Sequence, residues 1–139
     1  MDSATPYITI LALISGMLSC VPPPPNFEQL TDEYYLRAID TRQAMSVYRT
    51  LDDGGGIGRI RSTVYAVGWN DSHLIAKQHP GGNRKITGFY ILEIAKDNGH
   101  SSPAHCVTGP LTTTEFEAKR IELDVDPSLT FTRVLSDLE

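Results

Sequence analysis

Residues Ser62 to Trp69 read STVYAVGW, and this stretch decides the fold class. It is rich in β-branched and aromatic residues, the composition that favours β-strands. Asn70-Asp71 follows as a two-residue turn signal, and residues 73–77 (HLIAK) have the composition of a returning strand. The sequence therefore predicts an antiparallel hairpin with Trp69 near its closed end.

The segments on either side of this hairpin also have strand character. Residues 34–39 (YYLRAI) and 44–51 (AMSVYRTL) are predicted to form a second hairpin, and residues 52–58 (DDGGGIG) a flexible loop. This loop lacks the endings that phosphate-binding glycine loops require. In residues 88–94 (GFYILEI), apolar side chains fall on both faces, which indicates a central strand covered on both sides.

One helix is predicted near the C-terminus. Thr112 and Glu115 have the spacing of a capping box, and Phe116 and Leu123 share one helical face. Residues 129–134 suit a last strand or a short helix, and we favour the strand. The predicted fold is a β-rich α+β domain over residues 31–139, an antiparallel β-meander of about five strands with one C-terminal helix packed on the sheet.

The N-terminal segment has the pattern of an export signal. Tyr7 to Leu18 is apolar, and at about 1.5 Å per residue it is too short for the hydrocarbon core of roughly 30 Å. We expect residues 1–19 to be a signal peptide. Met17-Leu18-Ser19-Cys20 resembles a bacterial lipobox, although its leucine stands one place late and no Lys or Arg precedes the apolar run.

Residues 20–30 are predicted to be a lipidated cysteine and a proline-rich tether. The four prolines at 22–25 favour an extended polyproline II spacer of roughly 12 Å, suited to holding a domain off a membrane. An ordinary secreted cysteine at Cys20 is the alternative. In that case Cys20 is free to form a disulfide with Cys106, the other cysteine of the chain.

Composition limits the partners. The chain has 139 residues and a net charge of −5, with no basic tail, which argues against non-specific nucleic-acid binding. His100, His105 and Cys106 lie close in sequence, but their spacing matches no standard zinc pattern. No nucleophile elbow is present. We therefore expect no catalytic residues, no metal and no cofactor.

Aromatic residues of the predicted sheet are the candidate binding surface. Aromatic and basic side chains anchor protein interfaces when they are exposed on one face, although core packing is the default for such residues. The candidate partner-binding residues are Tyr65, Trp69, Lys77, Phe89 and Tyr90.

Residues 64–123 resemble an uncharacterised family of small bacterial cell-envelope lipoproteins with a domain of unknown function. The resemblance is carried by VYAVGWN at 64–70, LIAKQHP at 74–80, GFYIL at 88–92 and GPL at 109–111. It implies export, a lipidated cysteine, a short tether and a small β domain. It implies no activity.

These observations together predict an exported, lipid-anchored domain of the cell envelope, facing the periplasm or the cell exterior. Its expected role is non-enzymatic binding of another envelope component, with the membrane as a partner through the N-terminal lipid. Two alternatives remain at this point. One is an immunity-type inhibitor that blocks a toxin in the periplasm, and the other is a small hydrolase or metal-dependent enzyme.

Overall fold

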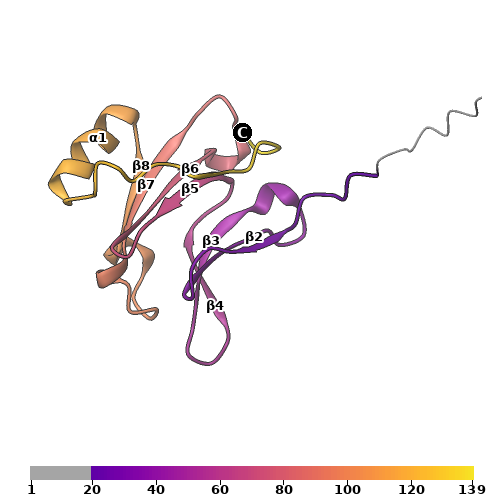
Figure 1. Ribbon diagram of the computed structural model, residues 1–139, viewed down its shortest axis with the longest axis horizontal. Helices are drawn as coiled ribbons and strands as arrows, with labels where there is room; N and C mark the ends of the chain where they lie inside the picture. Colours follow the sequence, from indigo (N-terminus) through magenta and orange to yellow (C-terminus); the bar gives the residue numbers. More distant parts are fainter. Residues whose placement is uncertain (1–19) are drawn as a thin grey trace, which may run out of the picture.

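The computed structural model describes residues 20–139, so the predicted signal peptide at 1–19 lies outside the described residues. Its core is built from two antiparallel sheets and one α-helix (Figure 1). The first sheet has the strand order β1-β2-β3-β4, comprising β1 (Phe27–Gln29), β2 (Tyr34–Arg37), β3 (Ser46–Thr50) and β4 (Gly56–Ile60).

The second sheet has the strand order β8-β7-β6-β5-β9, so four of its strands form a meander and the last returns to pair with β5. Its strands are β5 (Val64–Trp69), β6 (His73–Gln78), β7 (Gly88–Glu93), β8 (Val107–Leu111) and β9 (Arg133–Val134). The helix is α1 (Thr113–Glu122), and the short 3₁₀ turns are η1 (Arg42–Ala44), η2 (Pro80–Gly82), η3 (Ile94–Lys96) and η4 (Pro103–His105).

The β-rich α+β prediction is confirmed, including antiparallel pairing and a C-terminal helix on the sheet. The structure adds strands that the sequence analysis did not identify and divides the nine described strands between two sheets. The layers follow the order α1, second sheet, first sheet (Figure 1).

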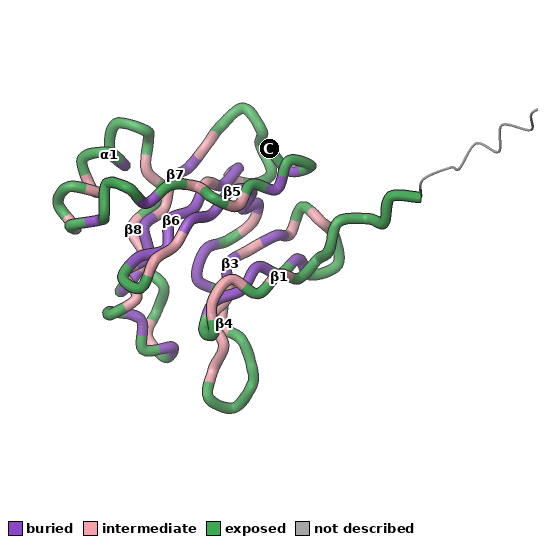
Figure 2. The backbone as a smooth tube through the Cα atoms, in the orientation of Figure 1, coloured by how far each residue is buried: buried purple, intermediate pink, exposed green. Residues whose placement is uncertain are grey.

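Two hydrophobic cores hold these layers together. The larger core lies between the sheets and contains Leu36 and Val47 from the first sheet with Leu74 and Leu92 from the second. The smaller core lies under α1 and contains Ile75, Ile91, Phe116, Val125 and Leu129. Figure 2 shows buried backbone along β5 and β6 between these layers. The predicted strand covered on both faces is confirmed over Gly88–Glu93, since Ile91 and Leu92 belong to different cores, whereas Ile94 begins η3.

The predicted hairpin between β5 and β6 is confirmed, with Trp69 paired to Leu74 near its closed end. Its turn is Asp71-Ser72 and not Asn70-Asp71, because Asn70 donates its N–H to the His73 carbonyl at 3.0 Å. Asn70 supports the turn because its side-chain oxygen accepts the N–H groups of Ser72 and His73, at 2.9 and 2.8 Å. The turn therefore has the local side-chain bonding that favours asparagine at such positions.

The capping box is also confirmed. The Thr112 hydroxyl accepts the N–H of Glu115 at 3.2 Å, and the Glu115 carboxylate accepts the N–H of Thr112 at 3.2 Å. Phe116 faces the smaller core and is 1% exposed, whereas Ile121 points away and is 84% exposed.

The predicted loop at 52–58 was wrong in its second half, because β4 begins at Gly56. Glycines disfavour strands in isolation. Here the absent side chain is required, since a Cβ at Gly56 would collide with the Tyr35 hydroxyl that lies over it. The last predicted strand, residues 129–134, is reduced to Arg133–Val134.

Residues 20–25 form an exposed, irregular segment that leaves one end of the body (Figure 1). Its base is held by Arg42, whose guanidinium donates to the Pro25 carbonyl and forms an ion pair with Asp137 at 2.7 Å. Residues 20–139 contain no helix with the length and apolar character of a membrane span.

Candidate functional site

A groove of about 550 Å³ runs beside β4, where the two sheets open toward η4. We call it the β4 groove. Its size is in the range of small-molecule and peptide sites. It is lined by Ser46, Tyr48, Gly58, Arg59, Ile60, Arg61, Tyr90, Ser102, Pro103, Ala104, Val107 and Gly109. These residues include two arginines and no acidic residue.

A β-bulge shapes the wall of the groove. Val47 pairs with Ile60 and Tyr48 with Gly58, so Arg59 is the extra residue and has no partner on β3. Bulges redirect side chains. The Arg59 side chain is 0% exposed, and its Nη1 donates to the Ser101 carbonyl at 2.9 Å. The bulge thus ties β4 to the loop that carries η4.

A buried carboxylate balances the arginines behind the groove. Asp97 lies with its Oδ1 2.9 Å from Arg59 Nη2 and 3.4 Å from Arg49 Nη1, and its Oδ2 accepts the Tyr34 hydroxyl at 2.8 Å. The Arg59 contact is one of charge, because Nε and Nη2 have no hydrogen-bond partner within residues 20–139. Arg49 also meets Glu33 at 3.4 Å, so this cluster is close to electroneutral.

Burial, reinforced by the bond to Asp97, raises the pKa of the Tyr34 phenol well above its usual range. The proton therefore stays on Tyr34, which remains a donor to Asp97 at neutral pH. The buried Asp97 carboxylate is thus held in place by the Tyr34 phenol and by the guanidinium groups of Arg49 and Arg59. The arrangement supports a structural role, since none of its charged groups except Glu33 is freely exposed.

A second chain of hydrogen bonds fixes the other arginine. The Tyr90 hydroxyl donates to the Gln78 side-chain oxygen at 2.9 Å, and Gln78 Nε2 donates to the Arg61 carbonyl at 2.8 Å. Burial raises the pKa of Tyr90, although Gln78 and the nearby Arg61 charge partly oppose this. The Arg61 backbone is fixed, while its side chain is exposed and makes no ion pair with any described residue.

The candidate binding residues from the sequence fall on two different faces of the second sheet. Tyr65, Trp69 and Tyr90 pack on the core between the sheets. Phe89 packs on the core under α1, and Lys77 lies over its ring at 5.8 Å. The five therefore do not form one surface, because neighbouring strand residues such as Phe89 and Tyr90 point to opposite faces.

Contacts within the fold account for most of these five side chains. Tyr65 stacks on His79 at 4.1 Å between ring centroids and bonds Thr87 at 2.9 Å. Lys77 pairs with Ala66, so it lies toward the open end of the β5–β6 hairpin and Trp69 lies at the closed end. Of the five candidates, Tyr90 is the one that lines the β4 groove.

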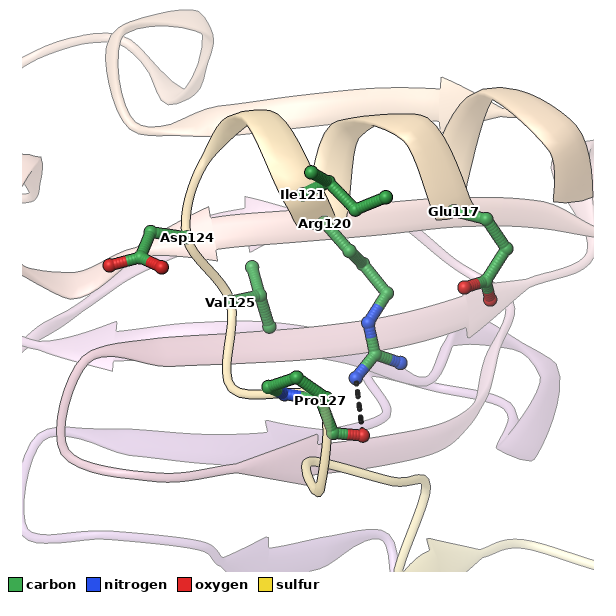
Figure 3. Close-up of a pocket in the computed structure, with 6 residues that line it drawn as sticks. All are labelled: Glu117, Arg120, Ile121, Asp124, Val125 and Pro127. Atoms are coloured by element: carbon green, nitrogen blue, oxygen red, sulfur yellow. Dashed lines mark hydrogen bonds between the residues drawn. The ribbon is translucent and has the colours of Figure 1, made fainter.

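A smaller pocket of about 330 Å³ lies at the C-terminal end of α1. Figure 3 shows Arg120 reaching from the helix toward the Pro127 carbonyl. The same guanidinium donates to the carbonyls of Asp126 and Leu129, at 3.0 and 2.7 Å. Its donors thus hold the loop after the helix, so the arginine of this pocket is already engaged within the fold.

The cysteine and histidine positions do not assemble into a site. Cys20 is exposed and Cys106 is buried, and both are free thiols. Burial raises the pKa of the Cys106 thiol, which disfavours the reactive thiolate. In the described part of the chain, no three His, Cys, Asp or Glu side chains are grouped as a metal ion would require.

Sequence reasoning did not identify Arg59, Arg61 and Asp97 as a linked set. Neither arginine was among the candidate binding residues. The only sequence feature near this site is that Arg59 and Arg61 flank Ile60 after a run of glycines. This feature gives no indication that Asp97 lies close to them.

Comparison with known proteins finds a family match over most of the chain. The family described as protein of unknown function (DUF3997) matches residues 31–136. No curated protein and no solved structure matches the chain. The matched region begins just after β1 and includes the whole β4 groove.

Proposed function

The chain belongs to the DUF3997 family of proteins of unknown function, and we propose that it is an exported, lipid-anchored domain that binds another cell-envelope protein through the β4 groove. The proposed role is non-enzymatic. Anchoring is assigned to Cys20, and binding is assigned to the groove between β4 and η4.

The N-terminal arrangement supports anchoring. Cys20 is exposed, follows the apolar segment Tyr7–Leu18 in the sequence, and precedes an extended proline segment that leaves the body. Arg42 holds the base of this segment at Pro25. A lipid on Cys20 would therefore lie outside the folded body, where it can enter a membrane without disturbing either core.

The β4 groove carries the binding proposal. It has a volume of about 550 Å³, two aromatic residues in its lining and an exposed arginine. Aromatic residues and arginine are enriched where proteins bind one another. The pocket at the end of α1, by contrast, has its arginine engaged by loop carbonyls.

Site-specific crosslinking in cells tests this proposal. A photoreactive amino acid replaces Ala104, which lines the groove, or Ala118, an exposed alanine on α1 that serves as the matched control. We expect a discrete envelope protein to crosslink at Ala104 and not at Ala118, and the adduct to disappear with Arg61→Glu. Equal crosslinking at both positions would contradict a role for the groove.

Mass spectrometry of the adduct identifies the captured protein. A toxin would assign the chain to the immunity-type inhibitors within the same binding proposal. In parallel, if Cys20 carries the lipid, Cys20→Ala should either release the chain from the membrane fraction or leave residues 1–19 uncleaved. A cleaved Cys20→Ala chain that stays in the membrane fraction would contradict the anchor, and the crosslink at Ala104 would still test the groove.

A further inference from the structure

The β4 strand has an open edge. It is the last strand of the first sheet, and Leu51 donates its N–H to the Gly55 carbonyl at 2.8 Å across the hairpin. Because antiparallel residues alternate in the direction of their backbone groups, Gly55 and Ile57 bond toward β3, and Gly56 and Gly58 point the other way. Among residues 20–139, no further backbone hydrogen bond reaches Gly56 or Gly58.

The other sheet edges are less suited to accept a strand. β1 has three residues and β9 has two, which is too short for an extended ladder. β8 contains Pro110, which has no N–H to donate. β4 offers five residues, and its two outward glycines have no side chains to obstruct an approaching backbone. A Cβ at Gly58 would have only Tyr48 Cε1 near it, at 3.9 Å.

The surroundings of this edge suit an extended peptide. A strand added to β4 would lie about 4.8 Å from it and would point its side chains alternately to either face of the sheet. The β4 groove provides space for such a strand beside Gly58, with Tyr48 and Tyr90 as its aromatic lining and η4 at its border. The hairpin of β3 and β4 projects from the body, so a partner can reach it (Figure 1).

Charge complementarity narrows the choice of peptide. Arg61 directly follows β4, is exposed and has no ion pair among the described residues, whereas Arg59 faces Asp97. The groove lining has no acidic residue. A carboxylate on the peptide is therefore the group that matches this end of the strand, because arginine binds carboxylates through paired hydrogen bonds.

We propose that the β4 groove binds an extended peptide segment of an envelope protein as an additional strand on β4, with a carboxylate of that segment on Arg61. This inference rests on the proposed function, because it names the kind of partner that the groove accepts. Main-chain bonds to Gly56 and Gly58 supply affinity, and Arg61 supplies charge selectivity.

The test uses the full chain, purified in detergent, and a display library of random peptides of about seven residues, enough to span β4 at roughly 3.3 Å per residue. We expect enrichment of peptides that carry Asp, Glu or a free C-terminal carboxylate. Replacing the acidic side chain by its amide, or amidating the C-terminus, identifies which carboxylate is bound. Failure to enrich any acidic peptide would overturn the proposal.

N-methylation of alternate peptide amides then tests strand pairing. It removes N–H donors but keeps every side chain. The frame whose N–H groups bond the carbonyls of β4 should therefore bind about tenfold more weakly, as expected when one or two backbone hydrogen bonds are lost. Binding that survives methylation in both frames would overturn strand addition.

Variants of the chain test the same bonds from the other side. Gly58→Pro removes an outward N–H, and Arg61→Glu reverses the charge. Each should weaken the selected peptide by about tenfold or more, whereas Arg37→Glu, an exposed arginine on β2, should not. Equal loss with Arg37→Glu would overturn the assignment to Arg61.

The two proposals fail in different ways. If an envelope protein crosslinks at Ala104 and not at Ala118, but no acidic peptide binds, the proposed function is supported and strand addition to β4 is contradicted. If peptide binding depends on Gly58 and Arg61 but no envelope protein crosslinks at Ala104, the peptide site is supported and the envelope partner is contradicted.

Discussion

Arg59 Nη2 lies 2.9 Å from Asp97 Oδ1, and both side chains are completely shielded from solvent. Arg59 is the bulged residue of the last strand in the first sheet, and Asp97 follows η3, the turn after β7 of the second sheet. The contact therefore ties the two sheets at the back of the β4 groove. Lys119 and Glu122 have the same separation of 2.9 Å on the exposed surface of α1.

These two ion pairs should differ greatly in their effect on stability. Asp97→Ala leaves two arginines without their buried carboxylate, and we expect the free energy of unfolding to fall by about 3–5 kcal/mol. Glu122→Ala should change it by less than about 1 kcal/mol, because exposed pairs are screened by water. Urea denaturation of the two variants measures both values, and similar losses would contradict the structural role of Asp97.

The Tyr34 phenol predicts a loss of stability at high pH. Its pKa is raised in the folded state above the ordinary value of 10.0, so the contribution is complete below about pH 10 and is lost as the pH rises through the folded pKa. Thermal melts from pH 8 to 11 should show this decline. Tyr34→Phe should reduce the slope, whereas Tyr48→Phe, outside both cores, should leave it nearly unchanged.

Burial of Phe116 should dominate the contribution of α1. Its ring stacks on Phe89 with centroids 4.9 Å apart, and Phe116→Ala should destabilise the domain by about 3–5 kcal/mol. Glu115→Ala, which breaks the capping box, should cost under about 1 kcal/mol. Ile121→Ala is the exposed control on the same helix. A stable Phe116→Ala protein would show that the smaller core is not needed.

The two cysteines should differ in their reaction with maleimide. Cys106 is buried and should react only after unfolding, in any form of the protein. Cys20 is exposed and should be protected only if it carries a lipid. Intact mass before and after denaturation separates the cases. An unmodified, rapidly labelled Cys20 in membrane-derived protein would rule out the lipid anchor.

Local patterns in the sequence predicted the elements that are stabilised locally. The capping box of Thr112 and Glu115, the turn at Asn70 and the two-faced strand around Ile91 each depend on residues near in sequence. β4 was missed because Gly56 and Gly58 favour loops, and only the rings of Tyr35 and Tyr48 lying over them explain the strand. That packing comes from side chains of β2 and β3, and the glycine run itself gives no sign of it.

The candidate site was harder to predict for the same reason. Tyr90 was identified as a candidate, but its partner Gln78 and the link to Arg61 depend on the register of β6 and β7. Arg59 and Asp97 meet only after both sheets have formed. No spacing rule along the chain connects Arg59 with Asp97. The sequence shows that both residues are charged, but it does not show that they form an ion pair.

Leu74 and Ile75 are neighbours in β6, yet they belong to the two different cores. β6 therefore contributes side chains to both cores. If either the first sheet or α1 detached, an apolar face of β6 would be exposed, and β6 also packs against the layer that remains. Amide hydrogens of β6 should consequently exchange with solvent only through global opening of the domain. Neither layer can serve as an independent folding unit, and a chain truncated before α1 would present Ile75 and Ile91 to aggregation.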